Sequence, residues 1–189
     1  MEARDFVGRT ADLRCLDRHL DVVRGGKARM LSVRGRRQVG KSRLVTKFLE
    51  RSGLPQLFVT GSRQATLTDD LARFSEDARL SSTLPGADLL AGGTYTNWEQ
   101  ALRAVAAALP TNGPGIVVLD ELPWLLERDP GLDGTLQKLW DRVFERHPVL
   151  VVLIGSDLSV MELLASHDRP LYGRTKEVVV TPFHVKDTA

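Results

Sequence analysis

The stretch ARMLSVRGRRQVGKS, residues 28–42, decides how the rest of the chain can be arranged. Its apolar segment 30–33 has the composition of a buried strand and leads into Gly35. Four variable residues then separate Gly35 from the triplet Gly-Lys-Ser, after which apolar residues recur at helical spacing. A strand, a glycine-rich turn of the form G-x-x-x-x-G-K-S and a helix together predict a loop that binds phosphate.

Each position of this loop has a chemical role. The glycines let successive backbone N–H groups turn into one concavity, and the following helix adds the positive end of its dipole. We expect Lys41 to reach the β- and γ-phosphate oxygens and Ser42 to ligate Mg²⁺, with the side chains of Arg36 and Arg37 in solvent. The predicted contacts to the nucleotide therefore cover the whole loop and the first helical turn: Gly35, Arg36, Arg37, Gln38, Val39, Gly40, Lys41, Ser42 and Arg43.

Composition narrows the class of protein. The 189 residues suffice for one domain with a full core, and 26 basic against 24 acidic side chains give a net charge of +2, which does not by itself indicate nucleic-acid binding. The single cysteine, Cys15, excludes an intramolecular disulfide and favours a reducing compartment. The longest apolar run, 149–154, is too short to span a bilayer, so we expect a soluble cytoplasmic protein with no membrane partner.

Helical and strand patterns alternate along the chain. Besides the helix after Ser42, helices are predicted over 11–24, capped by Thr10, and over 98–109, capped by Asn97 or Thr96. Three more helices are predicted over 66–80, 132–146 and 158–165. Further strands are predicted over 56–60, 115–120, 148–155 and 178–180, and a surface loop over 81–97. Because these strands are apolar throughout and do not alternate, they predict an α/β fold with a mostly parallel sheet covered on both faces.

Polar residues follow two of these strands directly. In a parallel α/β sheet, ligands bind outside the carboxyl ends of the strands. Asp120 ends one strand and is expected to hold Mg²⁺ through its water shell, while Glu121 is expected to orient and deprotonate an attacking water. Ser156 follows the next strand and could sense the γ-phosphate or hold that water; alternatively, its hydroxyl caps the helix that follows.

The segment 170–174, PLYGR, offers Arg174 as a cationic contact to the γ-phosphate, or else as an ordinary surface residue. ATP is favoured over GTP as the nucleotide, because the sequence has no Asn-Lys-x-Asp motif to read guanine. In addition, Asp120-Glu-Leu-Pro is not the Asp-x-x-Gly of a GTPase switch. The carboxylate of Glu121 favours a hydrolase over a small-molecule kinase, which has no special need of it.

These motifs, in this order, resemble those of the prokaryotic, largely archaeal-type AAA-like ATPases grouped with the STAND signal-transduction NTPases. The resemblance rests on FVGR at 6–9, Walker A at 35–42, Walker B at 116–125, the sensor segment at 153–162 and the late arginine at 174. It implies a P-loop NTPase three-layer sandwich with a five-stranded sheet in the order 5-1-4-3-2. It also implies an adenine pocket lined by Phe6, Val7, Gly8 and Arg9, and a place for Arg174 in the nucleotide site.

The resemblance also shapes the expected domain organisation and function. Family members usually continue into a helical region and a winged helix, so we expect an ATPase domain over 1–183, with 1–27 on the adenine side, a polar tail over 184–189 and no C-terminal domains. The expected function is Mg²⁺-dependent binding and slow hydrolysis of ATP by a regulatory ATPase, with ATP or ADP as ligand. The alternatives are a nucleotide-gated switch that binds a protein partner or self-associates, and a DNA-associated ATPase if a longer chain carries the winged helix.

Overall fold

The structure is a computed structural model that describes residues 9–182. Phe6, Val7 and Gly8, which are predicted to line the adenine pocket, lie outside the described residues, as does the tail 184–189.

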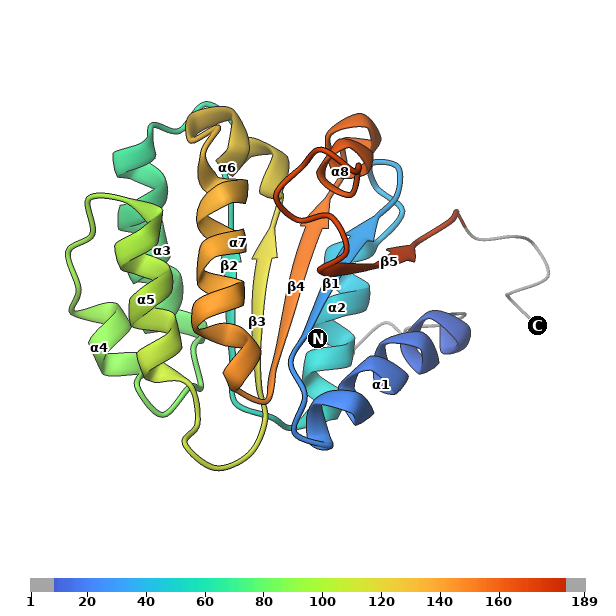
Figure 1. The fold of residues 1–189 in the computed structure, drawn as a ribbon, viewed down its shortest axis with the longest axis horizontal. Coiled ribbons are helices and arrows are strands. Elements are labelled where there is room, and N and C mark those ends of the chain that lie inside the picture. Colours follow the sequence, from blue (N-terminus) through green and yellow to red (C-terminus); the bar gives the residue numbers. More distant parts are fainter. Residues whose placement is uncertain (1–8, 183–189) are drawn as a thin grey trace, which may run out of the picture.

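The fold is built on a five-stranded sheet in which every pair of neighbouring strands is parallel. The strand order is β2-β3-β4-β1-β5, which confirms the predicted order 5-1-4-3-2. Their bounds are β1 (Arg29–Arg34), β2 (Gln56–Thr60), β3 (Gly115–Asp120), β4 (Val149–Gly155) and β5 (Thr175–Val179). Because the strands are parallel, their carboxyl ends meet at one edge of the sheet, where α6 and α8 begin (Figure 1).

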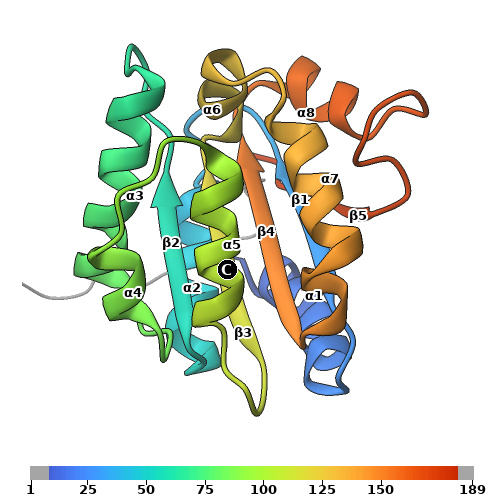
Figure 2. The same cartoon turned by 60° about the vertical axis from the view of Figure 1, so that its left-hand side comes forward.

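Helices cover both faces of the sheet and make three layers (Figures 1 and 2). One face is covered by α1 (Thr10–Arg24) and α2 (Lys41–Ser52). The other carries α3 (Leu67–Ser81), α4 (Ala87–Ala91), α5 (Trp98–Ala108), α6 (Leu122–Arg128), α7 (Leu132–Arg142) and α8 (Leu158–Leu164). The three-layer α/β architecture predicted from the alternation of patterns is therefore confirmed.

Two separate cores explain why β4 and the interior of β3 are apolar. Along β3, Val117 and Leu119 pack into the core under α3, α5 and α7, whereas Ile116 and Val118 pack into the core under α1 and α2. Successive side chains of a strand point to opposite faces, so a strand covered on both faces must be apolar throughout. All residues of β3 and β4 are buried accordingly.

Some local elements differ from the sequence prediction. The predicted loop 81–97 contains the short helix α4, because Leu84 and Leu90 pack into the core beneath it. Helix α6 was not predicted, since seven residues are too few for a helical period to be recognised. The predicted helix 132–146 ends at Arg142 and is followed by a 3₁₀ turn, Phe144–Arg146.

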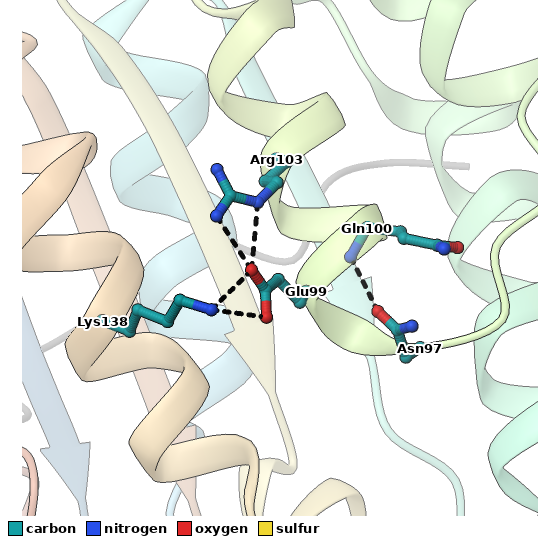
Figure 3. Close-up of polar contacts among 5 residues, drawn as sticks. All are labelled: Asn97, Glu99, Gln100, Arg103 and Lys138. Atoms are coloured by element: carbon teal, nitrogen blue, oxygen red, sulfur yellow. Dashed lines mark hydrogen bonds and ion pairs between the residues drawn. The ribbon is translucent and has the colours of Figure 1, made fainter.

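Helix α5 is held at its start by a cap and by two partners of Glu99 (Figure 3). The Asn97 side chain accepts a hydrogen bond from the Gln100 N–H at 2.9 Å, so Asn97 and not Thr96 is the cap. The Glu99 carboxylate accepts hydrogen bonds from Arg103 in the same helix and from Lys138 of α7, both at 2.8 Å. These contacts hold α5 beside α7 on their face of the sheet.

Within residues 9–182, no helix is both long enough and apolar enough to cross a lipid bilayer.

Candidate functional site

The loop between β1 and α2 takes the backbone conformation that the phosphate-loop motif requires. Gly40 has φ +88° and Gln38 has φ +63°, so the chain turns through the left-handed region twice before α2 begins at Lys41. Gly35 is required for a different reason. A Cβ at Gly35 would lie 2.3 Å from the carbonyl oxygen of Val180, so only glycine allows the chain after β5 to pass this close to the loop.

The amino group of Lys41 lies inside the loop. The side chain is only 6% exposed, and Nζ donates hydrogen bonds to the carbonyl oxygens of Gly35 at 2.9 Å and Arg36 at 3.0 Å. Burial lowers the pKa of Lys41, and the carboxylates of Glu121 and Asp120 oppose that shift. The loop thus holds a cation at the start of a helix, which is the arrangement that attracts a phosphate group.

Asp120 lies at the carboxyl end of β3 and is 4% exposed. Its carboxylate is hydrogen-bonded to the side chain of Ser42 and accepts the N–H of Glu121 at 2.9 Å. Burial raises the pKa of Asp120 in spite of these two hydrogen bonds. A serine hydroxyl beside a buried carboxylate is an oxygen donor set that fits Mg²⁺, whose remaining ligands would be phosphate oxygens and water.

The carboxylate of Glu121 is held by Ser156. The Ser156 hydroxyl donates to Oε2 at 2.9 Å and lies 3.2 Å from Oε1, so the ends of β3 and β4 meet in this contact. Glu121 has φ 52° and ψ 42°, a left-handed conformation that is costly for a residue with a side chain. The cap of α8 is Asp157, which accepts the N–H of Val160 at 3.1 Å, so the alternative of Ser156 as the cap is wrong.

A cavity of about 510 Å³ opens beside Glu121 and Ser156. Its lining includes Arg37 from the phosphate loop, Arg63 from the segment after β2, and Trp124 from α6. Sequence reasoning did not single out Arg63. The signal was available, because Arg63 follows the end of a parallel strand and so belongs to the same edge of the sheet.

Arg174 does not lie at this edge. It precedes β5, whose first residue, Thr175, pairs with Met30 near the start of β1. From Met30 the strand runs four more residues, about 13 Å, before it reaches the phosphate loop. The Arg174 guanidinium instead pairs with Asp141 of α7 at 2.7 and 2.8 Å. The predicted contact of Arg174 with a γ-phosphate is therefore wrong for a nucleotide bound in its own chain.

Arg9 is buried beside the phosphate loop, with 5% of its surface exposed. Its guanidinium donates to the carbonyl oxygens of Val39 and Thr181, each at 2.7 Å, and forms an ion pair with Asp12 at 3.0 Å. Arg9 thus ties the start of α1 to the loop and to the segment after β5. Its predicted contact with adenine stays a prediction.

Three comparisons relate this arrangement to known proteins. The chain is 27% identical over 177 residues to the uncharacterized protein MJECL04 of Methanocaldococcus jannaschii, an alignment that covers 92% of this chain and 35% of the relative. Among solved structures, the Walker-type ATPase PABY2304 of Pyrococcus abyssi is 20% identical with a TM-score of 0.69, covering 98% of this chain and 57% of that one. The ORC1 protein of Aeropyrum pernix, solved in complex with DNA, is also 20% identical with a TM-score of 0.64, covering 98% and 48%.

The similarity to these two solved structures shows the shared fold. This chain spans about half of the length of those structures and about a third of the curated relative. The family itself is shown by a match over residues 6–189 to the ATPase domain found predominantly in Archaea. The phosphate loop after β1 and the Asp120-Glu121 end of β3 meet at one edge of the sheet. The chain belongs to this archaeal ATPase domain family.

Proposed function

We propose that this domain binds ATP together with Mg²⁺ and hydrolyses it slowly, as the nucleotide-handling part of a larger regulatory protein. The observation that carries the proposal is the meeting of three strand ends at one edge of the sheet. There Lys41, the Ser42–Asp120 pair and the Glu121–Ser156 pair lie around a single phosphate-binding loop.

Each group has a role that follows from its surroundings. The buried ammonium of Lys41 binds the β- and γ-phosphate oxygens, with the backbone N–H groups of the loop around it. Ser42 and Asp120 would hold Mg²⁺, which when bound offsets the negative charge on the phosphates. Glu121 accepts the proton of the attacking water, and Ser156 orients its carboxylate through the hydroxyl that donates to it.

The proposal is tested by two measurements on the purified protein: calorimetric binding of Mg·ATP and release of phosphate. Lys41→Ala should weaken ATP binding by at least about tenfold, because a charged contact to phosphate is lost. Glu121→Gln should keep binding and reduce turnover by about 10²- to 10⁴-fold, the usual contribution of a general base. Unchanged ATP binding in Lys41→Ala would remove the basis of the proposal.

A second candidate is a nucleotide-gated switch that holds ATP or ADP for a protein partner, or for self-association, with little turnover. It is favoured by the Ser156 hydroxyl, which already engages both oxygens of the Glu121 carboxylate. Tightly bound ADP in the purified protein, with negligible phosphate release, would support the switch over the enzyme.

Two broader assignments stay proposals. Membership of the STAND group is supported by the order of the motifs from Arg9 to Ser156. A DNA-associated role in a longer protein is suggested by the Aeropyrum pernix relative, which was solved with DNA. It predicts binding to DNA that weakens steeply with salt concentration.

A further inference from the structure

Two arginines share the ring of Trp124 next to Glu121. The guanidinium carbon of Arg37 lies over the ring at 5.7 Å from its centroid, and that of Arg63 at 5.6 Å. Arg37 belongs to the phosphate loop, Arg63 to the segment between β2 and α3, and Trp124 to the first turn of α6. All three residues line the cavity that contains Glu121 and Ser156.

Neither guanidinium has an anionic partner. Among residues 9–182, no ion pair or hydrogen bond involves the side chain of Arg37 or Arg63, and their contacts to the indole ring are of the cation–π type. Two cations on one ring repel each other, and Arg37 also contributes to the lowered pKa of Lys41. Unpaired positive charge gathered beside a phosphate loop attracts an anion to the space between the charges.

The segment that carries Arg63 is anchored to the candidate catalytic strand. The N–H of Gly61 donates to the carbonyl oxygen of Asp120 at 2.9 Å, and the N–H of Ser62 lies 3.4 Å from the carboxylate of Asp70, a buried residue of α3. The Arg128 side chain of α6 donates to the carbonyl oxygen of Ala65. These contacts hold the segment against the end of β3, so the backbone of Arg63 has a defined position relative to Glu121.

The terminal phosphate of ATP needs more positive charge around it than Lys41 alone supplies. Lys41 serves the β- and γ-phosphates from inside the loop, but the charge that develops on the γ-phosphoryl oxygens in hydrolysis must be balanced from the side of the attacking water. Glu121 faces that side, in the cavity that Arg37 and Arg63 also line. Arg174, the cation expected there from sequence, pairs with Asp141 elsewhere.

We propose that Arg63, together with Arg37, contacts the γ-phosphate of ATP, and that Trp124 holds the two guanidinium groups in position for it. This inference rests on the proposed function, because it names further residues of the same ATP site. It predicts that the two arginines discriminate ATP from ADP. The loop binds the α- and β-phosphates, and only the γ-phosphate reaches Arg37 and Arg63.

The test compares Arg63→Gln with Arg142→Gln, a matched loss of charge at an exposed residue in the last turn of α7. Binding of Mg·ADP and of the non-hydrolysable analogue Mg·AMP-PNP is measured by calorimetry for wild type and both variants. Arg63→Gln should weaken binding of the analogue by about tenfold or more and change ADP binding by less than about twofold. Arg142→Gln should change neither.

Fluorescence gives a second readout that does not depend on activity. Trp98 and Trp140 are buried, whereas Trp124 is partly exposed between the two guanidinium groups. Binding of the analogue should change the emission of Trp124, because the γ-phosphate would engage the two guanidinium groups that contact its ring. Binding of ADP should leave the emission unchanged. Trp124→Phe should remove the change, which identifies its source.

The outcomes separate this inference from the proposed function. If wild type binds both nucleotides but Arg63→Gln leaves the ratio of their affinities unchanged, the role of Arg63 is refuted and the ATP site stands. If wild type binds neither nucleotide, both the inference and the proposed function fail. A selective loss of affinity for the analogue, accompanied by a smaller fluorescence change, would establish the contact.

Discussion

Gly61 offers a direct test of whether the segment that carries Arg63 must lie against the end of β3. Its φ is not in the left-handed region, so alanine could adopt the same backbone conformation. Space is the obstacle: a Cβ at this position would lie 2.8 Å from Cγ of Leu125 and 2.9 Å from the carbonyl oxygen of Glu121. The substitution Gly61→Ala therefore pushes the segment away from Glu121 without changing any polar group.

The size of the effect follows from these distances. Carbon atoms pack best at about 3.5–4.0 Å, so the new methyl group would overlap Leu125 by roughly 0.7 Å or more. Leu125 is buried in the core and cannot move aside, and overpacking of this kind costs about 1–3 kcal/mol. For a domain of this size, that lowers the melting temperature by about 2–12 °C. A displacement of the segment by several tenths of an ångström should also reduce turnover, by up to about 100-fold.

The assay is thermal unfolding followed by circular dichroism, with phosphate release measured on the same samples. The matched control is Gly134→Ala in α7, where an added Cβ would meet no atom within 4 Å. Alanine is favoured over glycine in a helix by about 0.5–1 kcal/mol, so this control should melt slightly above wild type and keep its turnover.

The reasoning would be refuted if the Gly61→Ala variant had the melting temperature of wild type and released phosphate at the same rate. It would mean that the segment after β2 can move away from Glu121 at no cost, and the defined position of Arg63 would lose its support. A fall in stability with full turnover would separate packing from catalysis and would leave only the packing claim.

Three further predictions concern the site and its surroundings. Ser156→Ala should lower phosphate release by about tenfold and leave ADP affinity unchanged in calorimetry, because Glu121 loses the hydroxyl that orients it; faster release would instead identify Ser156 as a restraint on the base. Burial raises the pKa of Asp120, so its charged form destabilises the folded protein above that pKa, and the effect fades as pH falls toward the ordinary aspartate range. Without Mg²⁺, Asp120→Asn should therefore have a higher melting temperature than wild type at pH 7, and the difference should be smaller at pH 4. An equal difference at both pH values would contradict this. Arg174→Gln should leave ATP affinity unchanged, because its partner is Asp141, and a loss of affinity would reinstate the role predicted from sequence.

The sequence predicted which residues meet at the centre of the candidate site, because two simple rules combine there. The phosphate-loop motif located Lys41 and Ser42, and the rule that parallel strands end at one edge added Asp120, Glu121 and Ser156. The same rule, applied fully, would have corrected the prediction for Arg174, because a residue that precedes a parallel strand lies at the opposite edge from one that follows it. It would also have added Arg63, which follows β2.

Other features could not be predicted because they depend on contacts between distant segments. Glycine is needed at position 35 because a Cβ there would collide with the carbonyl oxygen of Val180. The residues near Gly35 in sequence do not indicate this contact. The pairing of Trp124 with two arginines likewise depends on how α6 meets the segments that follow β1 and β2. The helix α4 was obscured by the glycines and hydroxyl residues on either side of it, although Leu90 anchors it in the core.

The Arg9 guanidinium connects the phosphate loop to both ends of the described chain. It bonds the carbonyl of Val39 in the loop and that of Thr181, while the Val180 N–H donates to the carbonyl of Arg34 at 2.8 Å. The two ends of the described fold are thus fastened to the same loop. Any segment that continues from either end would pull on the loop under load, and a nucleotide that displaces Val39 would shift both ends together.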